Sequence, residues 1–192
     1  MFKRLFWVVL SFCLLATHGE ALTIGGVQLD ESLKFADLDT ELILNGGGIR
    51  ETFFVDIYVA GLYLTKKSSD YADIMNRDES MAIKIQITSK LVNSKRFMEA
   101  TEDGFKRTTN NDPAYIQEEI DQALNVFDST FRVGDVFDIV YVKGTGTKFY
   151  KNGNFIATVK GMEFKKALFG IWIIDKPSHK CENLRLGMLG LK

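Results

Sequence analysis

The sequence predicts an α+β fold, in which an antiparallel sheet carries helices on one face. Segments with strand-like patterns lie toward both ends of the chain, and segments with helical periodicity lie between and after them. No internal repeat or low-complexity linker divides the 192 residues, and only Pro113 and Pro177 are prolines. We therefore expect a single domain around one main sheet.

The first third of the chain is expected to form strands. Residues 22–24 and 27–29 alternate around a Gly25-Gly26 bend, and residues 41–44 read as a strand that ends at a glycine turn. Residues 52–65 read as one long strand, apolar on both faces in its second half. Such a strand is expected to be covered on both sides.

A helical region is expected next, interrupted by one strand. Residues 69–75 predict a short helix with Ser69 as its cap, and residues 81–87 alternate as a half-buried strand. Asn93 can cap the following helix. The apolar stripe of that helix is expected to contain Phe97, Ala100, Thr101, Gly104 and Phe105.

The second half continues this pattern. Asp112 and Pro113 are typical of a helix start, and three strand-like runs follow at 136–142, 148–150 and 154–159. The chain should end in two helical segments. The apolar face of the helix after Pro113 is expected to contain Ile116, Ile120, Ala123, Leu124 and Phe127.

The N-terminus has the pattern of an export signal. Lys3 and Arg4 precede the apolar run from Leu5 to Ala16, and small residues around Ala21 suit a signal peptidase. A membrane-spanning helix needs roughly 20 apolar residues, which favours a cleaved signal over an anchor. We therefore expect a signal peptide over 1–21, cleavage after Ala21, a domain over 22–192, and a periplasmic or secreted protein without an integral membrane segment.

Composition narrows the classes of function. A formal net charge of −1 gives no reason to expect a nucleic-acid partner. Once Cys13 leaves with the signal, Cys181 stands alone and no internal disulfide can form. His179 would be the only histidine of the mature chain, so a multi-histidine metal site is excluded and a solvated histidine is favoured over a catalytic one. No metal or cofactor is expected.

In the segment Leu44-Asn-Gly-Gly-Gly-Ile-Arg50, one arginine follows three glycines and directly precedes an apolar strand. A phosphate loop is disfavoured because no helix start follows the glycines, so a tight turn is the preferred interpretation. A buried arginine needs a partner, either a ligand anion or a protein carboxylate. Tyr58 and Tyr63 lie farther along the long strand, and each could pack in the core or touch a ligand.

Two sets of residues resemble the chalcone isomerase-like family, in particular its exported bacterial branch. The first is Leu44-Asn-Gly-Gly-Gly-Ile-Arg50 with residues 54–64, and the second is Ala167-Leu-Phe-Gly-Ile-Trp172 with Asp175-Lys-Pro177. The resemblance implies an open-faced β-sandwich, a large antiparallel sheet with a layer of helices and a ligand cleft between them. It covers most of the mature chain.

The resemblance also implies which residues face the cleft. Plant members of the family close a flavanone ring with an arginine, a tyrosine, an asparagine and hydroxyl side chains. The arginine falls on Arg50, whereas Tyr58 replaces a threonine, Phe97 replaces the tyrosine and Gly104 replaces the asparagine. The late hydroxyl falls near Ile171 or Trp172. Most of the hydrogen-bond donors are therefore lost, and no catalytic residue is assigned.

Fatty-acid-binding relatives of this fold hold a carboxylate with an arginine and a tyrosine, a pattern that Arg50 and Tyr58 match. Eight residues of straight strand would span roughly 26 Å, so the two can share one carboxylate only if the chain bends between them. The residues expected to contact a ligand are Arg50, Tyr58, Tyr63 and Phe97.

Three hypotheses follow. The first is a non-catalytic protein that binds a fatty acid or similar small apolar acid at Arg50. The second is an isomerase or intramolecular lyase, which would need Tyr58, Tyr63 or Thr101 to converge with Arg50. The third is a structural, partner-binding protein in which Arg50 pairs with Asp56 or Glu51 and the cleft is closed.

Overall fold

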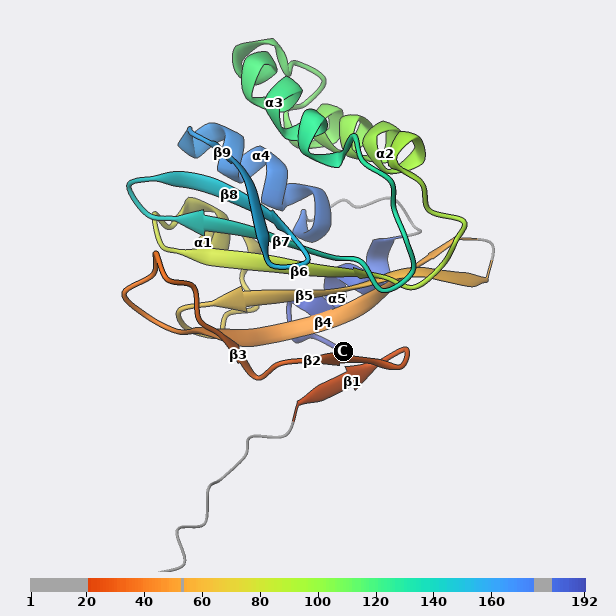
Figure 1. Cartoon of the computed structure of the whole chain (residues 1–192). Coiled ribbons are helices and arrows are strands. Elements are labelled where there is room, and N and C mark those ends of the chain that lie inside the picture. The colour runs from red at the N-terminus through yellow and green to blue at the C-terminus, as the bar shows by residue number, and fades with distance from the viewer. Residues whose placement is uncertain (1–20, 53, 175–180) are drawn as a thin grey trace, which may run out of the picture.

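The computed structural model describes residues 21–52, 54–174 and 181–192 (Figure 1). Nearly all of the expected signal peptide and the whole of the segment that contains His179 lie outside these residues. Among the described residues, no helix is both long enough and apolar enough to span a membrane.

The main sheet is antiparallel throughout and follows chain order from β3 to β9. A separate hairpin pairs β1 (Leu22–Ile24) with β2 (Val27–Leu29), as the sequence predicts. The seven strands of the main sheet are β3 (Ser32–Leu33), β4 (Leu42–Thr52), β5 (Val55–Leu64), β6 (Met81–Ile87), β7 (Val136–Val142), β8 (Gly146–Lys151) and β9 (Asn154–Val159).

Helices cover one face of this curled sheet, and the β1–β2 hairpin lies against the other (Figure 1). The predicted α+β class is therefore confirmed. A short 3-10 turn, Ala114–Ile116, precedes α3. The helices are α1 (Tyr71–Asn76), α2 (Ser94–Thr108), α3 (Gln117–Phe127), α4 (Met162–Ile173) and α5 (Glu182–Met188).

Alternation along the strands divides the apolar residues between two cores. In β5, Tyr58 and Leu62 belong to the larger core beneath the helices, whereas Val59 and Tyr63 belong to the smaller core beneath the β1–β2 hairpin. As predicted, β5 is buried on both faces through its second half. Successive side chains of a strand point to opposite faces, which places each residue on its side.

The helix starts agree with the sequence in one case and differ in two. Asn93 caps α2, because its side chain accepts a hydrogen bond from the Arg96 amide at 3.0 Å. The cap of α1 is Asp70 rather than Ser69, since the Asp70 carboxylate accepts from the Asp73 amide. Asp112 caps no helix, because the chain first makes a 3-10 turn after Pro113.

The predicted glycine turn is wrong, because the three glycines lie inside β4. Gly46 and Gly48 face α5, whose backbone approaches so closely that no side chain fits. A Cβ at Gly46 would overlap the carbonyl oxygen of Gly187, and one at Gly48 would lie 2.9 Å from the Cα of Leu184. The glycines are therefore needed for the close approach of a helix.

The chain reverses direction only after Thr52, between β4 and β5. In the resulting hairpin, Arg50 pairs with Tyr58 and Thr52 pairs with Val55. The single strand expected from residue 52 onward therefore begins three residues later, and a bend separates Arg50 from Tyr58. The hairpin brings the two residues onto neighbouring strands.

Candidate functional site

A cavity of about 330 Å³ lies between α2 and the hairpin of β4 and β5, and the ends of α4 and α5 complete its wall. Its walls are mainly apolar, with polar groups contributed from several elements. The described residues that line it are Arg50, Thr52, Ile57, Tyr58, Leu91, Val92, Arg96, Phe97, Ala100, Thr101, Arg107, Ile171, Trp172 and Cys181.

Arg50 and Tyr58 both face this cavity from adjacent strands. Residues directly opposite each other in an antiparallel pair have Cβ atoms about 4.5–5.5 Å apart. The guanidinium and the phenol can therefore reach one ligand group, which a straight strand would not allow. Arg50 is half-buried, and its Nη1 lies 3.4 Å from the Glu51 carbonyl oxygen.

The hydroxyl of Tyr58 is held in the wall of the cavity by Trp172. The indole Nε1 donates a hydrogen bond to Tyr58 Oη at 3.1 Å, which leaves the phenol proton available for an acceptor. Burial raises the pKa of Tyr58 to about 12, although the positive charge of Arg50 opposes this change. At neutral pH, Tyr58 is therefore a neutral hydrogen-bond donor.

Phe97 forms an aromatic wall of the cavity from the first turn of α2. Its ring centroid lies 6.2 Å from that of Tyr58 and 4.8 Å from that of Phe127. Farther along the helix, the Thr101 hydroxyl donates to the Phe97 carbonyl at 2.8 Å. Thr101 therefore lines the cavity with its proton already engaged by the helix backbone.

Tyr63, the fourth residue expected at the site, is not brought to the cavity. It lies five positions after Tyr58 in β5, an odd number, so its side chain points to the opposite face. There it is fully buried in the smaller core, and its hydroxyl has no hydrogen-bond partner among the described residues. The structure thus unites Arg50, Tyr58 and Phe97 and separates Tyr63.

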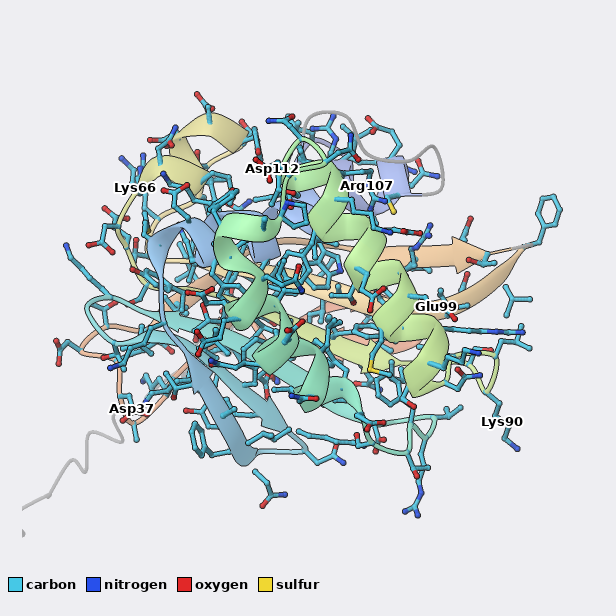
Figure 2. All side chains as sticks on the ribbon, turned by 90° about the horizontal axis from the view of Figure 1, so that it is seen from above. Asp37, Lys66, Lys90, Glu99, Arg107 and Asp112 are labelled. Carbon is cyan, nitrogen blue, oxygen red and sulfur yellow. The ribbon has the colours of Figure 1, made fainter. Side chains whose placement is uncertain are left out.

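Two further arginines line the cavity that the sequence analysis did not single out. Arg96 and Arg107 lie near the two ends of α2, whose course Figure 2 marks with Lys90 before the helix, Glu99 within it and Arg107 near its end. A signal was present for Arg107, because it lies three residues beyond Gly104 on the predicted apolar stripe. A charged residue on an apolar stripe indicates a buried polar contact or a ligand at that position.

The described lining suits anion binding. It contains three arginines and neither a carboxylate nor a histidine. Within the described part of the chain, no group of three or more His, Cys, Asp or Glu side chains could hold a metal ion. A cavity with apolar walls and a few converging cationic donors is typical of a site for an amphiphilic anion.

Fold and site together define an antiparallel sheet covered by helices, with a ligand-sized cavity between the two layers. The sequence profile of the chalcone isomerase-like family matches residues 21–190. The chain therefore belongs to the chalcone isomerase-like family, as the residues around Arg50 and Trp172 indicated.

A solved structure has the same fold. The crystal structure of a fatty-acid binding protein from Arabidopsis thaliana matches with a TM-score of 0.70 and 18% sequence identity, covering 88% of this chain and 96% of that one. At this identity the similarity concerns the fold alone. No curated protein matches the sequence significantly.

Proposed function

We propose that this protein binds a fatty acid or a similar apolar carboxylate in the cavity between the sheet and α2. The observation that carries the proposal is that Arg50 and Tyr58 lie opposite each other on adjacent strands and both line that cavity. The solved structure with the same fold is described as a fatty-acid binding protein, which agrees with this choice.

In this proposal Arg50 takes the carboxylate and Tyr58 adds a neutral hydrogen bond. A guanidinium can bind both carboxylate oxygens at once, and hydrogen bonds to charged groups each contribute about 1.5–3 kcal/mol. Phe97, Ile171 and Trp172 supply apolar wall for the chain of the ligand. The hydrogen bond from Trp172 fixes the orientation of the Tyr58 hydroxyl.

The other two hypotheses have less support. Of the groups that an isomerase would need, Tyr58 does line the cavity with Arg50. The Thr101 proton, however, is engaged by the helix backbone, Tyr63 lies on the other face, and Phe97 replaces the family's tyrosine. A closed structural protein would pair Arg50 with Asp56 or Glu51. In the structure, however, Arg50 lines an open cavity. The Arg50 guanidinium contacts the backbone carbonyl oxygen of Glu51.

The test is mass spectrometry of lipid extracted from protein purified from its natural compartment. We expect an apolar acid to be recovered from wild type and to be absent from Arg50→Ala. Arg132→Ala is the matched control, because Arg132 is an exposed arginine outside the cavity. Wild-type protein that carries no lipid and takes up no added fatty acid would contradict the proposal.

We also propose that the protein is exported and that residues 1–21 are its signal peptide. The support is the sequence pattern of Lys3, Arg4 and the apolar run to Ala16. N-terminal sequencing of the purified protein is expected to begin at Leu22. A chain that keeps Met1 through Ala21 would overturn this proposal without affecting the binding site.

A further inference from the structure

Among the described residues, Arg107 differs from the other buried or half-buried cations in having no partner. Lys84 pairs with Asp138, Lys165 donates to backbone carbonyls, and Arg185 pairs with Glu182. Within the described part of the chain, by contrast, neither a hydrogen bond nor an ion pair engages the guanidinium of Arg107, and its Nε is buried. Leaving a buried donor unsatisfied costs about 1–3 kcal/mol, more for a charged group.

The position of Arg107 on α2 explains why its side chain is directed toward the cavity. Phe97, Ala100, Gly104 and Arg107 are spaced by three, four and three residues, which places them on one stripe of the helix. The first two of these residues line the cavity, and Gly104 packs against Ile171, another lining residue. Arg107 therefore continues the face of α2 that is turned toward the sheet. It is half-buried, so its outer end stays accessible to a ligand.

The described lining of the cavity is cationic. Arg50 enters from the sheet, and Arg96 and Arg107 enter from α2. None of the described lining residues is acidic. Like charges within one partly apolar cavity raise each other's energy, and a ligand with two negative charges would offset more of that repulsion than a monocarboxylate.

We infer that Arg107 is a second anion-binding group of this cavity and that the preferred ligand is a dianionic amphiphile. The inference rests on the proposed function and narrows its ligand class. A phosphate monoester carries both charges at one end, about −1.5 to −2 at neutral pH. A dicarboxylic acid carries one charge at each end. Each of these ligands supplies a second negative charge, which can pair with the Arg107 guanidinium.

The experiment compares three ligands of equal chain length: dodecanoate, dodecanedioate and dodecyl phosphate. Binding to lipid-stripped protein is followed by the fluorescence of Trp172, which lies in the cavity wall. We expect wild type to bind at least one of the dianions about tenfold or more tightly than dodecanoate, as one added charge-assisted hydrogen bond allows. If the preferred ligand is the phosphate, both charges share one end, and if it is the dicarboxylate, they are held apart.

Arg107→Gln is expected to abolish this preference, because it should lower the affinity for the preferred dianion about tenfold more than the affinity for dodecanoate. Arg132→Gln is the control of equal charge change and is expected to leave all three affinities unaltered. Circular dichroism checks that each variant is folded, and the wild-type ranking needs no variant at all. Equal wild-type affinity for all three ligands would overturn the inference, as would an equal loss of all three in Arg107→Gln. Failure of every ligand to bind wild type would overturn the proposed function as well.

Discussion

The two faces of the seven-stranded sheet bury similar apolar side chains but leave different space beside them. Beneath the helices, Tyr58 has a hydrogen-bonded hydroxyl next to a cavity of about 330 Å³. Beneath the β1–β2 hairpin, Tyr63 is packed on all sides, and its hydroxyl has no partner among the described residues. The same residue type in the same strand thus lines a cavity on one face and fills the core on the other. Whether helices or the β1–β2 hairpin cover a face decides whether space for a ligand remains beside its tyrosine.

The largest difference is expected between alanine substitutions at Gly46 and Gly47, which face opposite sides of β4. Gly46→Ala would drive a methyl group into the backbone oxygen of Gly187, which cannot move without shifting α5. We expect a loss of about 3 kcal/mol or more in the free energy of unfolding. Gly47→Ala meets mainly the end of the Leu29 side chain, which can rotate away, so about 1 kcal/mol is expected. Urea denaturation measures both, and equal losses would contradict this account of the two faces.

An intermediate effect is expected for Lys165, whereas Lys84 on the other face is half-buried. Lys165, fully buried on the helical side, donates to the carbonyls of Ile74, Met75 and Arg77 at the end of α1. Lys165→Met leaves these acceptors unpaired and should lower stability by about 1–3 kcal/mol at neutral pH. Lys84, on the other face, keeps the Asp138 carboxylate as a partner.

The effect of Lys165→Met should also depend on pH in a defined direction. Burial lowers the pKa of Lys165 from 10.5 to about 8. The folded state therefore binds fewer protons than the unfolded state between these values, and wild-type stability gains as pH rises through this window. The advantage of wild type over Lys165→Met should grow by on the order of 1 kcal/mol per pH unit between about 8 and 10. Chemical denaturation at several pH values measures it, and an advantage that shrinks in this window would refute the assignment.

The smallest effects, of opposite sign, are expected from removing the two tyrosine hydroxyls. Tyr58→Phe breaks the hydrogen bond with Trp172 and should lower the free energy of unfolding by about 1 kcal/mol. It should also weaken binding of an apolar acid several-fold. Tyr63→Phe removes a buried hydroxyl without a described partner and should leave stability unchanged or raise it by up to about 1 kcal/mol. Thermal unfolding of both variants tests the difference, which would be contradicted if Tyr63→Phe were the more damaging change.

Much of the fold could be predicted because its signals are local. The alternation of apolar and polar residues located β6, a strand-like run located β7, and Asn93 marked the start of α2. The role of Gly46 and Gly48 could not be predicted, because the helix that requires them lies far along the chain. Local patterns show that a glycine is needed but not which element approaches it.

The candidate site was also predictable only in part, because its residues are brought together by contacts that local patterns do not show. Arg50 and Tyr58 were identified, but their proximity depends on a hairpin whose turn lies after Thr52. Tyr63 could have been separated from Tyr58 by counting positions along one strand. Arg107 could have been found as a charge on an apolar stripe. Its lack of a described partner required the packed structure.

The contact between β4 and α5 also sets an order of events when the chain is made. The side chain of Asn45 donates to the Met188 carbonyl oxygen at 2.8 Å across a separation of 143 residues, next to the glycines that α5 covers. Until residues 184–188 have left the ribosome, the glycine face of β4 has no helix to cover it, although all the strands have already been synthesised. We expect the last step of maturation to be the arrival of α5.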